Sequence, residues 1–159
     1  QHSESPDSLA FSQSMPYEAA IDDDRRAALA GADAVAVLHG LLTPEDAAYA
    51  RQAGVRPVIN SVAQARRWHE AGGGCCDLMV DTGMNRLGLA LADIADPAIG
   101  ALDIDVLHSH LVAAEDDAPL NGRQLARWQD ARRMVRHRRA ALANSAGIML
   151  GEAYHGDLT

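Results

Sequence analysis

The chain has 159 residues, of which 48% are hydrophobic, and this is enough apolar material for one globular domain with a core. Its formal net charge is −8, so no domain-wide positive field would attract nucleic acid or an anionic membrane surface. All 14 basic residues are arginine. The absence of lysine excludes any mechanism in which this chain itself supplies an ε-amino group. No apolar run approaches the length of a membrane span.

Residues 1–16 are polar and have neither a basic nor an apolar leader region, so they are predicted to be a tail or a cut edge rather than a secretion signal. Residues 17–159 are predicted to form one α/β domain. Its first element is a helix over Tyr17–Ala30, with acidic residues in its first half and a stop at Gly31.

Apolar strands and amphipathic helices then alternate along the chain, with short loops between them. The predicted strands and helices are, in order, a strand over 34–38, a helix over 43–54, a strand over 57–60, a helix over 61–71, a strand over 78–80, a strand over 104–111, a helix over 121–138 and a strand over 141–143. Thr43 and Ser61 are the predicted N-caps of the first two of these helices. About five to six strand–helix units of this kind imply a parallel sheet. Because a closed eight-unit barrel needs about 250 residues, the chain is either an open α/β sheet or part of a barrel.

Two local clusters have simple structural interpretations. The adjacent Cys75 and Cys76 would point to opposite faces of a strand, which disfavours a shared metal or a disulfide and favours a reduced pair in a cytosolic protein. The basic run 132–139 is predicted to be a solvated last turn of the long helix, where positive charge suits the helix dipole.

The segment 81–88, Asp-Thr-Gly-Met-Asn-Arg-Leu-Gly, follows the strand at 78–80 and therefore lies at the carboxyl end of the sheet, where ligands bind. Gly83 and Gly88 permit a tight turn. Arg86 is presented between them, and a guanidinium held in this way suits a carboxylate or a phenolate oxygen. The alternative is a structural turn in which Arg86 pairs with Asp81.

The run Val80–Gly88 resembles the signature of alanine racemases, which use pyridoxal 5′-phosphate (PLP). Further segments resemble the family in the same order and spacing, from about Phe11 to Thr159: 37–41, 57–61, 108–111, 121–127 and 143–146. The resemblance implies that the chain is part of the family's N-terminal domain, a partial TIM (β/α)8-type barrel of parallel strands.

The resemblance also implies roles for single residues. Arg86 would bind the phenolic oxygen of PLP and help to hold the substrate carboxylate, and His110 would pack beside the cofactor ring. Asn144 and Ser145 would contact the cofactor phosphate. For Ser145 this agrees with its place at a helix start, where free N–H groups favour an anion. The alternatives are a strand histidine satisfied within the fold at His110 and a simple N-cap at Ser145.

Asp81 and Met79 are expected to support Arg86. Many relatives carry a carbamylated lysine two residues before the motif aspartate, and this lysine orients the arginine. Met79 occupies that position here, so we expect Arg86 to be oriented by other contacts.

The implied activity is that of an isomerase: interconversion of L- and D-alanine through a Schiff base with PLP, supplying D-alanine for peptidoglycan in a cytoplasmic homodimer. The Schiff-base lysine is expected before Gln1, and the tyrosine base is expected in a separate β domain. No catalytic base is therefore present, and the chain alone is expected to be inactive. One alternative is a non-catalytic PLP- or phosphate-binding module. Another is a metal-dependent hydrolase using His108 and His110, although no further ligands are evident and no metal is expected.

Overall fold

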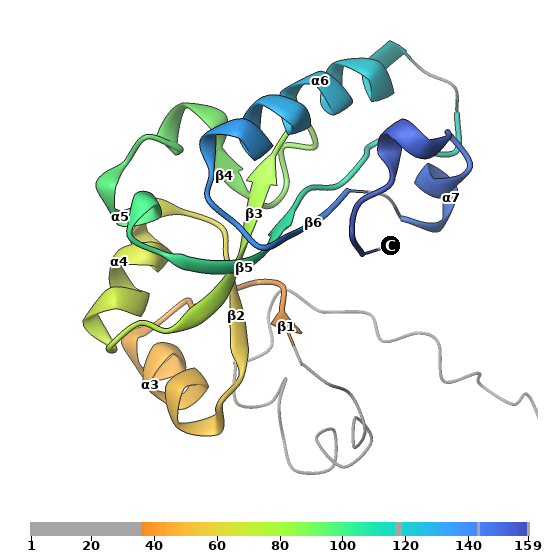
Figure 1. Ribbon diagram of the computed structural model, residues 1–159. Helices are drawn as coiled ribbons and strands as arrows, with labels where there is room; N and C mark the ends of the chain where they lie inside the picture. The colour runs from red at the N-terminus through yellow and green to blue at the C-terminus, as the bar shows by residue number, and fades with distance from the viewer. Residues whose placement is uncertain (1–35, 117–118, 143, 159) are drawn as a thin grey trace, which may run out of the picture.

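The computed structural model describes residues 36–116, 119–142 and 144–158 (Figure 1). The predicted tail and the predicted helix over Tyr17–Ala30 lie outside these residues. Five strands form a parallel sheet in the order β1-β2-β3-β5-β6, and a short β4 pairs with β3 beside this path. The strands are β1 (Ala36–Val37), β2 (Arg56–Ile59), β3 (Cys75–Asp81), β4 (Leu89–Ala90), β5 (Asp103–His108) and β6 (Arg139–Ala141). The predicted partial barrel of parallel strands is confirmed.

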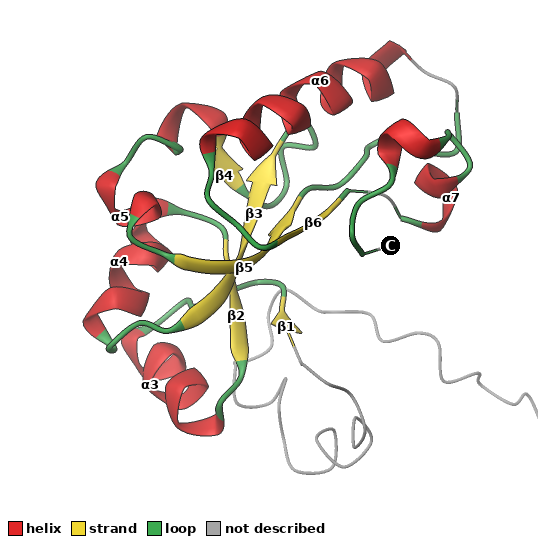
Figure 2. Cartoon of the chain, in the orientation of Figure 1, coloured by secondary structure: helices red, strands yellow, loops and turns green. Residues whose placement is uncertain are grey.

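Helices connect the strands, and Figure 2 shows α3 to α6 ranged along one side of the curved sheet. The helices are α3 (Pro44–Ala53), α4 (Val62–Glu70), α5 (Pro97–Gly100), α6 (Pro119–Met134) and α7 (Ser145–Ile148), with short 3₁₀ turns at Leu91–Asp93 and Glu152–Tyr154. Helix α3 begins at a capping box between Thr43 and Asp46 and ends at Gly54 in the left-handed conformation, as predicted. Within the described residues, no helix is both long and apolar enough to cross a membrane.

The core lies between the sheet and these helices. Cys76, Leu78 and Val80 of β3 are at most 1% exposed and belong to one apolar cluster, which also contains Trp68 of α4 and Trp128 of α6. The alternate residues of β3 face the other side of the sheet. The core therefore uses one face of β3.

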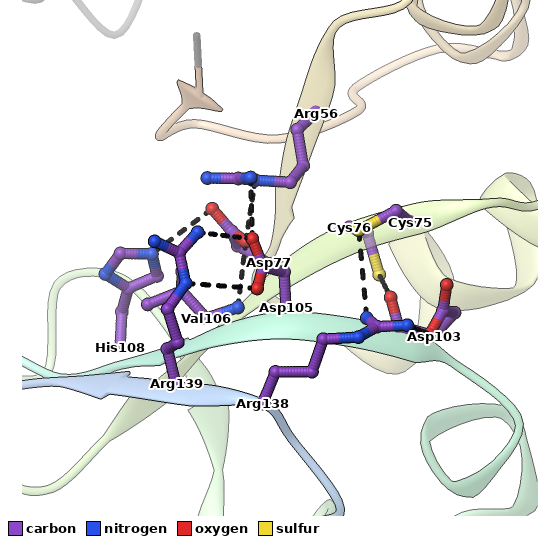
Figure 3. A network of polar contacts seen from close by, with 10 residues as sticks. All are labelled: Arg56, Cys75, Cys76, Asp77, Asp103, Asp105, Val106, His108, Arg138 and Arg139. Carbon is purple, nitrogen blue, oxygen red and sulfur yellow. Dashed lines mark hydrogen bonds and ion pairs between the residues drawn. The ribbon is translucent and has the colours of Figure 1, made fainter. Parts of the chain in front are cut away.

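The other face of the sheet carries charge (Figure 3). Arg56 of β2 lies between two carboxylates, with Nε 2.9 Å from Asp77 Oδ1 and Nη1 2.7 Å from Asp105 Oδ2. Arg139 of β6 also binds Asp105, and this contact lowers the pKa of that carboxyl. Asp77 is fully buried, yet both its oxygens have partners, since Oδ1 also accepts from Val106 N and Oδ2 lies 3.3 Å from His108 Nε2.

The predicted boundaries of three strands, β3, β5 and β6, were wrong. β3 begins at Cys75 rather than Leu78, because the buried Asp77 interrupts the apolar run without ending the strand. β5 ends at His108 rather than Leu111, and its pairing with β3 shifts register between Cys76 and Leu78. β6 covers Arg139–Ala141, so it begins and ends two residues earlier than the strand predicted over 141–143.

The prediction for the basic run was also wrong. Helix α6 ends at Met134, so only Arg132 and Arg133 lie in its last turn. Arg138 lies in the loop before β6 and pairs with Asp103 at 2.6 Å, while Arg139 lies within β6. Cys75 is exposed and Cys76 is buried, as predicted for neighbours that point to opposite faces of a strand.

Gly40 and Gly54 give a matched test of packing at the sheet edge. Both have φ near +70° (70° and 66°), but a Cβ at Gly40 would overlap Gln64 Oε1 and lie 2.5 Å from Val58 O, whereas a Cβ at Gly54 would meet nothing. We expect Gly54→Ala to lower the free energy of unfolding by about 1 kcal/mol, the cost of a left-handed alanine. Gly40→Ala should cost roughly 2 kcal/mol more, because the backbone must also shift. Urea unfolding measures both, and equal losses would contradict the packing at Gly40.

Candidate functional site

The loop that follows β3 is organised by the side chain of Asp81. Its Oδ1 accepts hydrogen bonds from the backbone N–H groups of Gly83, Met84 and Asn85, at 2.8 to 3.1 Å, and its Oδ2 accepts a second one from Asn85 at 2.9 Å. A carboxylate that accepts this many amide bonds fixes the path of the turn. Asp81 is therefore engaged by backbone and does not pair with Arg86, so the alternative of an Asp81–Arg86 turn is wrong.

Two positions in this loop depend on backbone conformation. Asn85 has φ 55°, the left-handed region that Asn tolerates better than most residues. Gly88 has φ 113°, and a Cβ there would lie 2.7 Å from Asp81 N and 3.1 Å from Met79 Cγ. The Met79 side chain thus packs against Gly88 from β3, in the position where the resemblance expects a lysine.

Arg86 is exposed at the tip of this loop, and within the described residues it takes part in no ion pair. Its guanidinium lies near enough to His110 for its charge to act on the imidazole. The pKa of His110 is lowered, first by burial and second by the positive charge of Arg86, while Glu115 acts in the opposite direction. The pairing of Met79 with His108 places the segments that carry Arg86 and His110 side by side at the carboxyl edge of β3 and β5, and His110 lies just beyond the end of its strand.

A chain of buried polar side chains lies beneath Arg86 and His110, and sequence reasoning missed it. Thr82 and Ser109 hydroxyls are 2.8 Å apart, and Ser109 Oγ donates to Val80 O at 2.9 Å. Gln124 of α6, which is fully buried, donates through Nε2 to Thr82 Oγ1 at 3.2 Å and to His110 O at 3.0 Å. The available signal was a glutamine among the core-facing positions of a helix, where burial without partners is costly.

His108 is not held with His110 as a ligand pair. Its Nε2 contacts Asp77 on the charged face of the sheet, and the strand ends before His110. Within the described residues no group of three His, Cys, Asp or Glu side chains has the arrangement of a metal site.

Asn144 and Ser145 follow β6. Asn144 is the N-cap of α7, and its Oδ1 accepts from Gly147 N at 2.8 Å, while Ser145 is the first residue of that helix. In the described part of the chain, no hydrogen bond joins Asn144 to Arg86 or His110. His110 and Asn144 nevertheless follow neighbouring strands, β5 and β6, which pair in parallel.

The electrostatics of His110 lead to a pH prediction. Because its pKa in the folded chain lies below the ordinary value near 6.5, the unfolded chain binds this proton more tightly, and His110 should add stability as the pH rises through the window below about 6.5. NMR titration of the imidazole should give the lowered pKa directly. Arg86→Met should raise the pKa but leave it below the ordinary value, since burial remains. The control Arg132→Met, in the last turn of α6, should leave it unchanged; an unaltered pKa in Arg86→Met would contradict the placement of Arg86.

Comparison with known proteins identifies the family. The family model "Alanine racemase, N-terminal domain" matches residues 17–159. The catabolic alanine racemase of Mesorhizobium japonicum is 39% identical, over 84% of this chain and 38% of that protein, and the alanine racemase of Rhizobium meliloti is 45% identical, over 65% and 30%. The chain thus spans less than two fifths of the length of either relative.

Solved structures agree with this. The alanine racemase of Bartonella henselae, solved with covalently bound pyridoxal phosphate, superposes with a TM-score of 0.69 at 29% identity, over 79% of this chain and 39% of that one. The alanine racemase of Corynebacterium glutamicum has the same fold, with a TM-score of 0.70 at 18% identity, over 85% of this chain and 42% of that one. Together with the motif loop at the carboxyl edge of the sheet, these matches show that the chain belongs to the alanine racemase family and corresponds to part of its N-terminal barrel domain.

Proposed function

We propose that these residues form the part of a PLP-dependent alanine racemase that holds the cofactor and the substrate, and that Arg86 is its main binding group. The observation that supports this most is the exposed Arg86 with no carboxylate partner among the described residues, beside the half-buried His110. A guanidinium left without an internal partner is free to bind an external anion.

The residues present fit PLP. Its phenolate oxygen and phosphate are anionic. The site offers a guanidinium that pairs with no carboxylate of the described residues, and an imidazole whose lowered pKa keeps it neutral near pH 7. A neutral His110 beside the cofactor ring adds no second positive charge next to Arg86. When bound, PLP would supply the electron sink that allows a proton to leave the α-carbon of an amino acid.

Asn144 and Ser145 are proposed to hold the cofactor phosphate. The family resemblance supports this, and so does the start of α7, where Asn144 caps Gly147 N and the first-turn N–H groups of Ser145 and Ala146 have no partner within the helix. Asp81 would act indirectly, by fixing the turn that carries Arg86, and Met79 by packing under Gly88.

Inversion at an α-carbon needs a base on each face, and the family resemblance assigns these roles to a lysine and a tyrosine. The 159 residues contain no lysine. We therefore propose that the chain as given holds PLP but does not racemise alanine unaided. For the whole enzyme, the same resemblance supports alanine as substrate, a homodimer, a cytoplasmic location and D-alanine for peptidoglycan as the use of the product.

The second candidate is a non-catalytic PLP- or phosphate-binding module of the same family. The absence of lysine favours it, because a lysine-free chain can hold the cofactor only without a Schiff base to lysine. The two proposals share the binding site. They differ in whether the site would racemise alanine once the lysine and the tyrosine of the family were also present.

PLP titration tests the binding proposal. The chain should bind PLP reversibly, as followed by quenching of tryptophan fluorescence, and Arg86→Met should weaken binding by about tenfold or more, since a hydrogen bond to a charged group contributes about 1.5–3 kcal/mol. The matched control Arg132→Met removes the same charge elsewhere and should bind PLP as the parent chain does. Equal affinities for both variants would contradict the role of Arg86.

An activity assay tests the proposal that the chain does not racemise alanine unaided. The purified chain with saturating PLP and L-alanine should form no D-alanine above the rate with PLP alone, measured by chiral chromatography. Formation of D-alanine above that rate would show that the chain contains a base that the proposal does not assign.

A further inference from the structure

The side-chain amide of Gln124 contacts all the segments that meet beneath Arg86 and His110. Gln124 is fully buried on α6, and its hydrogen bonds reach the loop after β3 and the segment after β5. We propose that Gln124 is a positioning residue that locks the Arg86 loop and His110 into one fixed arrangement; this rests on the proposed function of the same site.

The contacts leave the amide only one orientation. Val112 N–H can only donate, and it donates to Oε1 of Gln124 at 3.0 Å. The carbonyl of His110 can only accept, and it accepts from Nε2 at 3.0 Å. Both ends of the amide are therefore committed to the backbone on either side of Leu111. A residue that cannot both accept and donate here cannot replace it.

The second proton of Nε2 extends this clamp to the Arg86 loop. Because Val80 O can only accept, Ser109 must donate to it, so Thr82 must donate to Ser109 and is left to accept from Gln124. The hydrogen-bond chain runs in one direction, from Gln124 through Thr82 and Ser109 to Val80. Arg127, one turn further along α6, adds a bond to Thr82 O at 3.0 Å.

Thr82 is the residue between Asp81 and Gly83, so its position sets where the turn carrying Arg86 begins. His110 O, held by the same amide, sets the position of the imidazole. Loss of the amide would leave Val112 N–H and His110 O unpaired and would remove the bond to Thr82, so the two segments would lose one of the contacts that hold them together. The separation of Arg86 and His110 is thus fixed through Gln124, which contacts neither of their side chains in the described hydrogen bonds.

The fold contains a close copy of this arrangement on another pair of strands, with no hydrogen bond to the Arg86 loop or to His110 among the described residues. Gln64 of α4 is also buried; its Oε1 accepts from Asn60 N at 2.7 Å, and its Nε2 donates to His39 O at 3.1 Å. It joins the segments after β1 and β2 as Gln124 joins those after β3 and β5. The two glutamines therefore serve as test position and matched control.

The experiment compares Gln124→Met with Gln64→Met, since methionine keeps the length of the side chain and adds no charge. Both variants should lose thermal stability. Only Gln124→Met should weaken PLP binding by about tenfold, the equivalent of about 1.4 kcal/mol. Only in this variant should the His110 pKa, followed by NMR, rise toward its ordinary value, because the positive charge of Arg86 moves away.

Thr82→Val provides a second, milder variant in case Gln124→Met does not fold. It keeps the shape of the side chain and the bonds of Gln124 to the backbone. It removes the hydroxyl group that links Gln124 and Ser109 to the Arg86 loop. It should weaken PLP binding and raise the His110 pKa in the same direction as Gln124→Met, and the double variant should be no weaker than Gln124→Met alone.

The outcomes separate this inference from the proposed function. Unchanged PLP affinity and an unchanged His110 pKa in Gln124→Met or Thr82→Val would overturn the positioning role, as would equal effects in Gln64→Met. If the parent chain fails to bind PLP, the proposed function fails, and the His110 titration in the same variants still decides whether Gln124 sets the arrangement.

Discussion

The parallel pairing of β3 with β5 is the constraint on which the site depends. Parallel strands end at the same edge of a sheet, so the loop after β3 and the segment after β5 must meet there, although they are more than twenty residues apart in sequence. The polar contacts between the two segments follow from this meeting. Thr82 reaches Ser109 because their strands are neighbours, and α6 returns over the same edge to add Gln124 and Arg127.

The sheet has one apolar face and one charged face, and this difference explains why the strand pattern in the sequence alternates. One face packs against helices through Leu78 and Val80, and the other carries Arg56 between Asp77 and Asp105. The buried carboxylate of Asp77 is tolerated because each of its oxygens has a partner. A strand with apolar residues on only one face has an alternating pattern, unlike the continuous apolar run expected of a sheet buried on both faces.

Local sequence signals predicted the elements that local physics controls. The start of α3 at Thr43 and its stop at Gly54 follow from capping, and both were predicted correctly. The extents of β3 and β5 were not, because Asp77 is paired across three strands and the register shift of β5 arises from pairing, neither of which a single segment reveals. At the site, the position of residues 81–88 after a parallel strand was predicted correctly, whereas ligand binding there and the roles of Arg86 and His110 stay predictions. The burial of Gln124 could have been suspected from its place on the helix, but its hydrogen-bond partners could not be predicted, since they lie on separate elements.

Because Met79 stands where relatives carry a lysine, the position of Arg86 does not depend on a modified side chain. In relatives that carry a carbamylated lysine at this place, as the family resemblance implies, a covalent adduct of carbon dioxide holds the arginine. A thioether forms no such adduct and carries no charge, and here it fills the space beneath Gly88 by packing alone. The arrangement of the Arg86 loop is therefore left to the Asp81 carboxylate and to amide and hydroxyl groups. None of these groups forms an adduct with carbon dioxide under ordinary conditions, so the loop should not vary with the bicarbonate content of the surroundings.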